Sequence, residues 1–251
     1  MKKNALITGA SSGIGLATAR AFATQKINLI ICGRNKEKLF EIKNELKQFV
    51  EVEVLCFDVS KKDEVEFAFN TLNDEWKQID ILVNCAGNAH GLSSIENGDL
   101  NDWDMMIDTN VKGMLYVSRF IMPIMVERKK GHIINISSVA GKYTYQNGAV
   151  YCASKKAVEA ISEGMRFDLT QHGIKVTNIA PGAVETNFSV VRFKGDEDRA
   201  KKVYEGFDPI KPEDVADAIV YAINAPKNVT IADMVLYAGA QSAPTTIYRN
   251  N

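Results

Sequence analysis

The sequence predicts a doubly wound α/β fold, in which a seven-stranded parallel sheet carries helices on both faces. Short apolar segments alternate along the chain with longer segments in which apolar residues recur about every 3.6 residues. This alternation is typical of βαβ units, whose strands run parallel. In addition, a glycine-rich turn at residues 8–15 joins the first expected strand to the first helix, at the edge where open α/β sheets bind ligands.

The expected elements follow from the position and length of each apolar segment. The strands span residues 5–7, 28–32, 51–57, 80–83, 132–136, 175–179 and 230–236. The helices between them span residues 16–23, 36–49, 63–76, 103–128, 153–171 and 212–223. Ser60, with Asp63 three residues later, indicates a capped start for the third helix, and Pro212 indicates the start of the last one.

Length and composition favour a single domain over residues 1–251. With 46% hydrophobic and 24% charged residues, the chain is long enough to bury one large core, and no repeat or Pro/Gly/Ser-rich linker marks a second domain. The exception to the regular pattern is the charged segment 188–208. We interpret this segment as a lid-like insertion over a binding site.

Charge and cysteine content exclude several classes of protein. The 30 basic and 31 acidic side chains are scattered and leave a net charge of -1, so neither nucleic acid nor an anionic membrane is expected as a partner. No apolar run is long enough for a signal-peptide core or a membrane span. The four cysteines lack the spacing of a metal or redox motif and are interpreted as reduced thiols. We therefore expect a cytoplasmic enzyme that acts on a small molecule without a metal.

The glycine-rich turn is the first candidate binding site. Glycines permit a sharp turn and a close approach of the backbone to a ligand, and the N-terminus of the following helix offers free backbone N–H groups to a dinucleotide pyrophosphate. Taken alone, three glycines would also suit a tight turn without a ligand, but the strand before and the helix after favour binding. The candidate contacts are Gly9, Ser11, Ser12, Gly13, Ile14 and Gly15.

The end of the second expected strand indicates which dinucleotide binds. An acidic residue there would accept hydrogen bonds from the adenosine ribose, as NAD requires, whereas the sequence has Gly33-Arg34-Asn35. The Arg34 guanidinium suits a 2'-phosphate, with the Ser12 hydroxyl as a second donor, so NADP is the expected cofactor. The alternative is that Arg34 is a surface arginine without a ligand.

Tyr151 and Lys155 form the candidate catalytic pair. Residues four apart lie on one face of a helix. A tyrosine ordinarily loses its proton near pH 10, and a neighbouring ammonium favours the phenolate, so we expect Lys155 to lower the pKa of Tyr151 toward neutrality. Ser138 ends the fifth expected strand at the ligand-binding edge and is expected to hold the reacting oxygen. The alternatives are a chance spacing of Tyr and Lys and a serine that only caps a turn.

Taken together, the motifs resemble those of the short-chain dehydrogenase/reductase family, and the match covers nearly every residue. The motifs are Thr8-Gly9-x-x-x-Gly13-x-Gly15, Asn84-Cys85-Ala86-Gly87, Asn110, Ser138, Tyr151-x-x-x-Lys155 and Pro181-Gly182. The resemblance implies a single Rossmann-like domain assembled as a homotetramer. It also implies that Asn110 is a fourth catalytic residue, which holds a water linking Lys155 to solvent.

The resemblance assigns further cofactor contacts by position. Lys155 would bind the nicotinamide ribose beside Tyr151, and Thr186 would contact the carboxamide. The other implied contacts, from adenine to nicotinamide, are Asp58, Val59, Asn84, Ala86, Gly87, Pro181, Gly182, Val184 and Phe188. Cys85 departs from the family, which usually has an asparagine there that braces the central strand. Cys152 is given no chemical role.

Finer features resemble one branch of the family, the NADP-dependent 3-hydroxy acid dehydrogenases. They are found at residues 127–136, 185–196, 211–216 and 228–231. The branch implies hydride transfer between NADP and the C3 hydroxyl of an acid of the serine, allo-threonine, 3-hydroxypropionate or 3-hydroxyisobutyrate type. Tyr151 would take the hydroxyl proton while Ser138 holds the oxygen.

A carboxylate substrate needs a cation, and Arg192 is the candidate because it follows the expected nicotinamide contacts. The alternative is that Arg192 pairs with an acidic neighbour or a partner subunit. Two other functions remain open. The same residues could reduce another carbonyl, such as a 3-oxoacyl thioester, a sugar or a ketone, or the chain could be a non-catalytic NADP-binding sensor.

Overall fold

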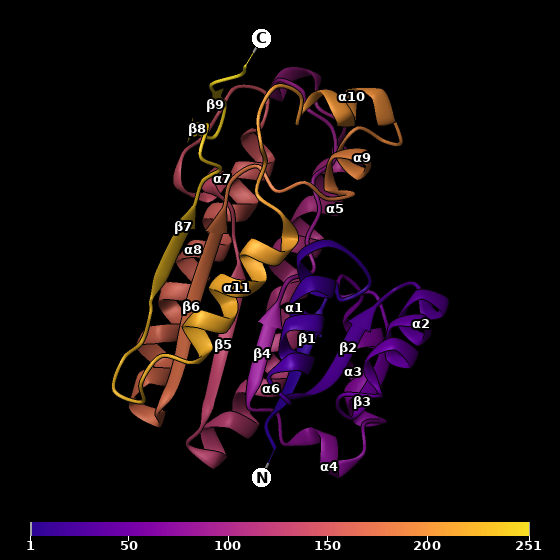
Figure 1. The fold of residues 1–251 in the computed structure, drawn as a ribbon, viewed down its shortest axis with the longest axis vertical. Helices are drawn as coiled ribbons and strands as arrows, with labels where there is room; N and C mark the ends of the chain where they lie inside the picture. The colour runs from indigo at the N-terminus through magenta and orange to yellow at the C-terminus, as the bar shows by residue number, and fades with distance from the viewer. Residues whose placement is uncertain (1, 251) are drawn as a thin grey trace.

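A computed structural model describes residues 2–250 and confirms the predicted seven-stranded sheet. All neighbouring strands pair in parallel, in the order β3-β2-β1-β4-β5-β6-β7 (Figure 1). The strands are β1 (Asn4–Thr8), β2 (Asn28–Gly33), β3 (Val52–Cys56), β4 (Ile81–Asn84), β5 (Gly131–Ile136), β6 (Ile174–Pro181) and β7 (Asp233–Leu236). The order reverses between β1 and β4, which is where open α/β sheets bind nucleotides.

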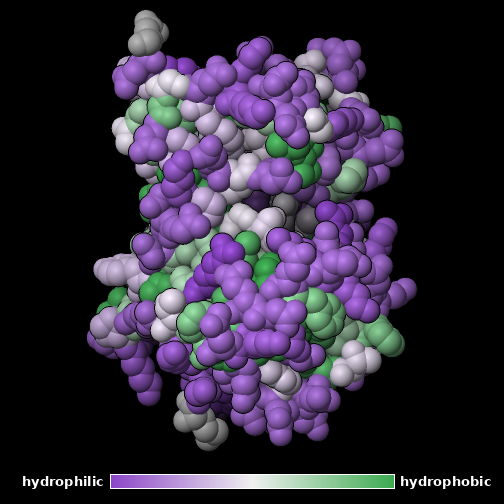
Figure 2. Space-filling view, turned by 45° about the vertical axis from the view of Figure 1, so that its right-hand side comes forward, coloured by the Kyte–Doolittle hydropathy of each residue, from purple (hydrophilic) through white to green (hydrophobic). Residues whose placement is uncertain are grey.

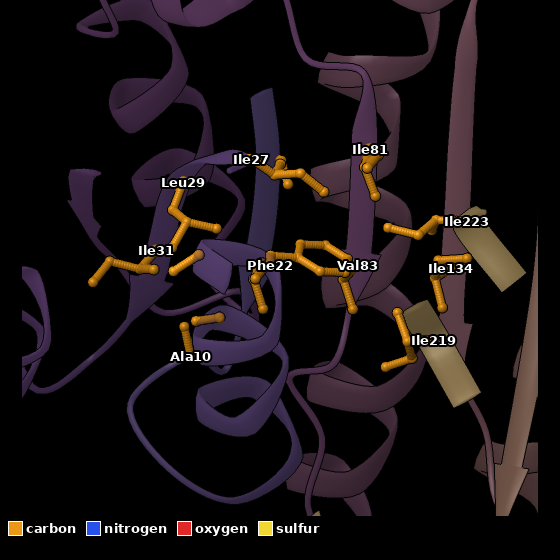
Figure 3. Packing of buried hydrophobic residues seen from close by; sticks show 14 of the residues in the cluster. Ala10, Phe22, Ile27, Leu29, Ile31, Ile81, Val83, Ile134, Ile219 and Ile223 are labelled. Atoms are coloured by element: carbon orange, nitrogen blue, oxygen red, sulfur yellow. The ribbon is translucent and has the colours of Figure 1, made fainter. Parts of the chain in front are cut away.

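Helices cover both faces of the sheet, as predicted, because successive apolar side chains in each strand point to opposite faces. Ile7 packs in one buried cluster and Leu6 in the other. One face is covered by α1 (Gly13–Thr24), α2 (Lys36–Leu46) and α11 (Pro212–Ile223), and the other by α3 (Lys62–Asn70), α6 (Met114–Arg128) and α8 (Ala149–Leu169). Figure 3 shows Phe22 of α1 beside the sheet residue Val83, with Ile219 and Ile223 of α11 on the other side of Val83 in this view.

Two of the predicted helices are interrupted. The segment predicted as one helix over residues 63–76 contains α3 and the short α4 (Asp74–Lys77). The α3 helix begins at Lys62 rather than being capped by Ser60, because the Ser60 N–H and hydroxyl both donate to Asp58, at 2.9 and 2.8 Å. The segment predicted over residues 103–128 contains α5 (Leu100–Ile107), the π-helical turn η2 (Asp108–Gly113) and α6.

The last of the predicted helices, α11, begins at Pro212 as predicted. The carboxylate of Asp214 accepts the backbone N–H of Lys211 at 2.7 Å, which satisfies a donor at the helix N-terminus. Within residues 2–250, none of the helices combines the length and the apolar composition needed to cross a bilayer.

Several short elements lie at the carboxyl edge of the sheet, above the strands in Figure 1. They include α7 (Val139–Lys142), α9 (Phe188–Arg192), α10 (Glu197–Lys202) and the antiparallel pair β8 (Gln241–Ala243) and β9 (Thr246–Ile247). Single helical turns, η1 (Ile95–Asn97) and η3 (Thr170–His172), complete the chain. The β8–β9 hairpin was not predicted. After this hairpin in the chain, the Asn250 N–H donates a hydrogen bond to the Gly206 carbonyl at 2.7 Å, so the C-terminal segment is attached to the segment that follows α10.

Candidate active site

The glycine-rich turn forms a backbone cradle at the N-terminus of α1. Gly9 has φ +67°, and a Cβ there would lie 3.0 Å from the backbone of Ala86. A Cβ on Gly15 would lie 2.3 Å from the carbonyl oxygen of Gly9, so the helix starts in direct contact with the turn. The first N–H groups of a helix have no partner within the helix and, with the helix dipole, attract an anion. The cradle therefore fits a pyrophosphate.

A groove extends from this cradle and has a volume of about 250 Å³. It brings together most of the predicted dinucleotide contacts. These are Gly9, Ser11, Ser12, Gly13, Ile14, Gly15, Arg34, Asp58, Val59, Ala86, Gly87, Thr186 and Phe188. The Arg34 side chain is 72% exposed, and its Nη1 atom lies 3.6 Å from the Asp58 carboxylate. An exposed pair at this distance is weak, so the guanidinium stays available to a phosphate.

A second pocket of about 350 Å³ adjoins the groove at the carboxyl ends of β4, β5 and β6. The two share five lining residues, Ile14, Cys85, Gly87, Thr186 and Phe188. The second pocket is lined by all the remaining predicted site residues except Asn84 and Asn110. Those that line it are Ser138, Tyr151, Lys155, Pro181, Gly182, Val184 and Arg192. The surface of the molecule is hollowed between its upper and lower parts (Figure 2). Groove and pocket together are large enough for a dinucleotide and a small substrate.

Lys155 lies on α8 on the same side as Tyr151, and both side chains are buried at the pocket. The ammonium of Lys155 donates to the carbonyl of Ile136, at the end of β5, over 3.0 Å. Burial disfavours the charged form and lowers the pKa of Lys155 from its ordinary value of 10.5 to about 8. Lys155 is therefore a cation held in the site at the expense of folding stability.

This cost predicts how the stability of a Lys155→Met variant depends on pH. The pKa of Lys155 is lower in the folded state than in the unfolded state, so the unfolded chain binds the proton more tightly. The destabilisation caused by burying the charged ammonium is therefore fully present below pH 8 and vanishes above pH 10.5. Relative to the variant, the wild type should gain about 3 kcal/mol of unfolding free energy across this interval. Urea unfolding at several pH values measures the difference. A difference independent of pH would mean that Lys155 titrates alike in both states.

The environment of Tyr151 differs from the expectation. Burial raises the pKa of its phenol above the ordinary value of 10.0. The groups that oppose this rise are the Ser138 hydroxyl, through a hydrogen bond, and the Arg192 guanidinium, rather than Lys155. The expectation that Lys155 lowers this pKa is therefore wrong for the structure described. The reason is that the Lys155 ammonium is directed to the Ile136 carbonyl, while burial of the phenol disfavours its charged form.

Asn110 lies in the π-helical turn η2, and hydrogen bonds to neighbouring residues fix the orientation of its side chain. Its amide nitrogen donates to the carbonyl of Asn88 at 2.8 Å and to the hydroxyl of Ser154 at 3.0 Å, and its oxygen accepts the Asn88 N–H at 2.8 Å. A Cβ on Gly87 would lie 3.2 Å from the Asn110 oxygen and 3.3 Å from the Lys155 nitrogen. Asn110 therefore adjoins Lys155 across Gly87, although it lines neither cavity.

Asn84 is the other predicted residue that lines neither cavity. Its side chain points into the core, where the amide nitrogen donates to Ser118 at 3.0 Å and to Asn135 at 2.9 Å. Only its backbone is left to approach a cofactor. Cys85 is the next residue, where the family usually has an asparagine that braces the central strand. Here the hydroxyl of Thr8 accepts the N–H groups of both Cys85 and Ala86 at 3.0 Å, so the end of β4 is held without a side-chain amide.

Arg192, on α9, has its guanidinium in the second pocket. Its Nη2 atom donates to the hydroxyl of Tyr145 at 2.8 Å, and the guanidinium carbon lies 5.4 Å from the centre of the Tyr151 ring. The Nε atom is buried without a hydrogen-bond partner. Among residues 2–250, no carboxylate lies within ion-pair distance of Arg192. The described chain therefore leaves this cation uncompensated, next to the candidate catalytic phenol.

Some lining residues were not found by sequence reasoning. They come from the loop before α8 and from the C-terminal hairpin, and they are Tyr145, Gln241, Pro244, Thr245 and Ile247. None of them belongs to a motif. The side-chain oxygen of Gln241 accepts the N–H of Ala183 at 2.9 Å, so the hairpin is fixed to the loop that follows β6.

The chain is similar to known proteins along nearly its whole length. A family model described as short chain dehydrogenase matches residues 3–197. The NADP-dependent 3-hydroxy acid dehydrogenase of Schizosaccharomyces pombe is 39% identical over 250 residues, 98% of this chain and 96% of that protein. The NADP-dependent 3-hydroxy acid dehydrogenase YdfG of Escherichia coli strain K12 is 42% identical over 238 residues, 94% of this chain and 95% of that protein. The closed form of a serine dehydrogenase complexed with NADP+ is 39% identical, with a TM-score of 0.90, over 99% of this chain and 100% of that one.

Proposed function

Because the chain belongs to the short-chain dehydrogenase family, we propose that it transfers a hydride between NADP and the C3 carbon of a 3-hydroxy acid. The family expected from the sequence is confirmed, and the names of the similar proteins agree with the expected cofactor and reaction. One observation on this chain carries the choice of an acid: the uncompensated guanidinium of Arg192 lies 5.4 Å from the Tyr151 ring. A cation beside a proton-transfer group suits a carboxylate whose hydroxyl is two carbons away.

The residues that line the two cavities suit different parts of the cofactor. The cradle of Gly9, Gly13 and Gly15 would hold the pyrophosphate, and Arg34 the 2'-phosphate. Lys155, which lines the pocket next to the shared residue Gly87, would bind the nicotinamide ribose. When bound, NADP supplies the acceptor for the hydride that leaves C3 during oxidation.

The side chains of the pocket would handle the proton. Tyr151 takes the proton of the C3 hydroxyl, while Ser138, whose hydroxyl lowers the pKa of the phenol, holds the same oxygen. The raised pKa of Tyr151 favours the protonated phenol, the form that donates a proton during carbonyl reduction. For oxidation, additional positive charge must lower this pKa, and oxidised nicotinamide carries such a charge. Asn110 would connect Lys155 to solvent for proton exchange.

Arg192→Ala tests the proposed substrate class. With the guanidinium lost, kcat/KM for 3-hydroxypropanoate should fall roughly a hundredfold more than kcat/KM for its methyl ester, since a charge-assisted hydrogen bond contributes about 1.5–3 kcal/mol. The two compounds share one carbon skeleton and differ in charge. Rates are measured from nicotinamide absorbance with NADP as acceptor.

Arg199→Ala is the matched control, because Arg199 is an exposed arginine of the same segment, on α10. It should leave the preference for acid over ester unchanged. Equal losses on acid and ester in Arg192→Ala would remove the carboxylate role. Turnover of the ester or of other alcohols, with none of any acid, would favour a different carbonyl substrate.

We also propose a lid over the pocket, an oligomeric state and a cellular compartment for the enzyme. We infer that residues 188–208 act as a lid, because α9 supplies Phe188 and Arg192 to the pocket wall. A homotetramer is supported by large apolar side chains exposed on two helices, Leu115 on α6 and Phe167 on α8. The four unpaired cysteines suit a reducing compartment such as the cytoplasm.

A further inference from the structure

We propose that Tyr145 is a positioning residue that holds the Arg192 guanidinium ready for a substrate carboxylate, and that Tyr145 thereby sets the preference for acids over uncharged alcohols. The inference rests on the proposed function and adds to it a residue outside the recognised motifs. The two side chains come from segments 47 residues apart, and both line the pocket that contains Tyr151.

Tyr145 contacts the guanidinium in two ways. Its hydroxyl accepts the hydrogen bond from Nη2 of Arg192 at 2.8 Å, and the centre of its ring lies 5.6 Å from the guanidinium carbon. The second distance is within the range of a cation–π interaction. The hydroxyl engages one Nη atom, and the buried Nε atom has no hydrogen-bond partner. A bound carboxylate would supply the acceptor that this nitrogen lacks.

The chemistry of the tyrosine matters because it holds the cation without neutralising it. An aspartate or glutamate at this position would form an ion pair with Arg192 and compete with a substrate carboxylate. Burial raises the pKa of the Tyr145 phenol, so the group stays neutral at physiological pH. The guanidinium is oriented and keeps its full charge for a ligand.

Two carboxylates at the start of α5, Asp99 and Asp102, pair with another residue. The ammonium of Lys194 lies 3.0 Å from Asp102 and 3.4 Å from Asp99. Asp99, Asp102 and Arg192 line the same small cavity, yet both carboxylates pair with Lys194 and neither lies within ion-pair distance of the guanidinium. This pairing keeps Arg192 free.

Tyr145 is itself fixed to the catalytic helix. Its carbonyl accepts the N–H of Gly148 at 3.2 Å, and a Cβ on Gly148 would lie 2.1 Å from the tyrosine ring. Gly148 directly precedes α8, the helix that carries Tyr151. On the other side, the Arg192 carbonyl accepts the N–H of Gly91 at 2.9 Å. Tyr145 therefore sets the position of the cation relative to the proton-transfer group, which is the geometry that a 3-hydroxy acid must match.

The test is Tyr145→Phe, which keeps the ring and removes only the hydroxyl. We expect the ratio of kcat/KM for 3-hydroxypropanoate to kcat/KM for its methyl ester to fall about tenfold, corresponding to about 1.4 kcal/mol. The loss should lie in the KM of the acid more than in kcat. Propanoate, which has the carboxylate but no hydroxyl, should inhibit ester oxidation by the variant about tenfold more weakly.

Tyr143→Phe is the matched control, because Tyr143 lies two residues away in the same loop and is 62% exposed. It should change neither the ratio nor the inhibition by propanoate. Equal losses on acid and ester in Tyr145→Phe, or unchanged inhibition by propanoate, would overturn the role of Tyr145. If propanoate inhibits the wild type and Arg192→Ala abolishes that inhibition, the proposed function stands whatever Tyr145→Phe shows. Absence of any preference for the acid in the wild type would overturn the proposed function itself.

Discussion

Tyr151→Phe is expected to lower kcat by roughly 10²–10⁴-fold, the usual contribution of a positioned proton donor or acceptor. The phenol is buried in the pocket that Ser138 also lines, and its ring lies close to the Arg192 cation. Its ring would remain in place, packed 5.7 Å from the ring of Phe188, so the pocket should keep its shape. The affinity for NADP, measured by fluorescence titration, should change far less than kcat.

Tyr221→Phe serves as the control, because Tyr221 lies on α11 with its side chain 67% exposed. Its kcat should equal that of the wild type. If Tyr151→Phe kept full kcat, another group would have to move the proton. If the variant lost kcat but kept its full effect in the cell, the chain would act as an NADP-binding sensor rather than as a catalyst.

Gly15→Ala is expected to destabilise the fold by about 3 kcal/mol and to abolish measurable NADP binding. The added Cβ would lie 2.3 Å from the carbonyl oxygen of Gly9 and 2.7 Å from its carbonyl carbon. Both atoms belong to the backbone, so the turn must shift away from α1, and the N–H groups that face the pyrophosphate would no longer converge. Thermal unfolding and NADP titration measure the two effects.

Gly164→Ala is the matched control for this substitution. Gly164 lies within α8, and a Cβ there would meet no atom within 4 Å. Alanine favours a helix interior over glycine by up to about 1 kcal/mol, so the control should be as stable as the wild type or more stable. Equal NADP affinity in Gly15→Ala and the wild type would show that the turn does not bind the pyrophosphate.

The local pattern of the sequence was sufficient to predict the strands of the sheet and much of the candidate site. All seven strands were predicted because each is short, apolar and bounded by polar residues. The spacing of Tyr151 and Lys155 placed both on one side of α8, since a helical turn brings residues four apart together. Parallel strands end at one edge of a sheet, so Gly9 after β1 and Ser138 after β5 had to lie at the same edge.

Helix interruptions were not predictable in this way. The segment around Asn110 has helical periodicity throughout, yet the structure widens it into the π-helical turn η2. The Asn110 side chain bonds to Asn88 and Ser154, residues that are distant in sequence and that the periodicity of one segment does not report. Likewise, Asn84 ends β4 at the ligand-binding edge of the sheet, but its side chain turns into the core to meet Ser118 and Asn135.

The sequence by itself determined the order of the strands and helices, the dinucleotide cradle and the pair of Tyr151 and Lys155, because these depend on residues close together in the chain. Only the tertiary structure decided the charges around the phenol. Burial raises the pKa of Tyr151, and the cation that opposes the rise, Arg192, comes from a distant segment and is held there by Tyr145. Burial and the distance between charges depend on how the elements pack, and a linear pattern does not contain either quantity.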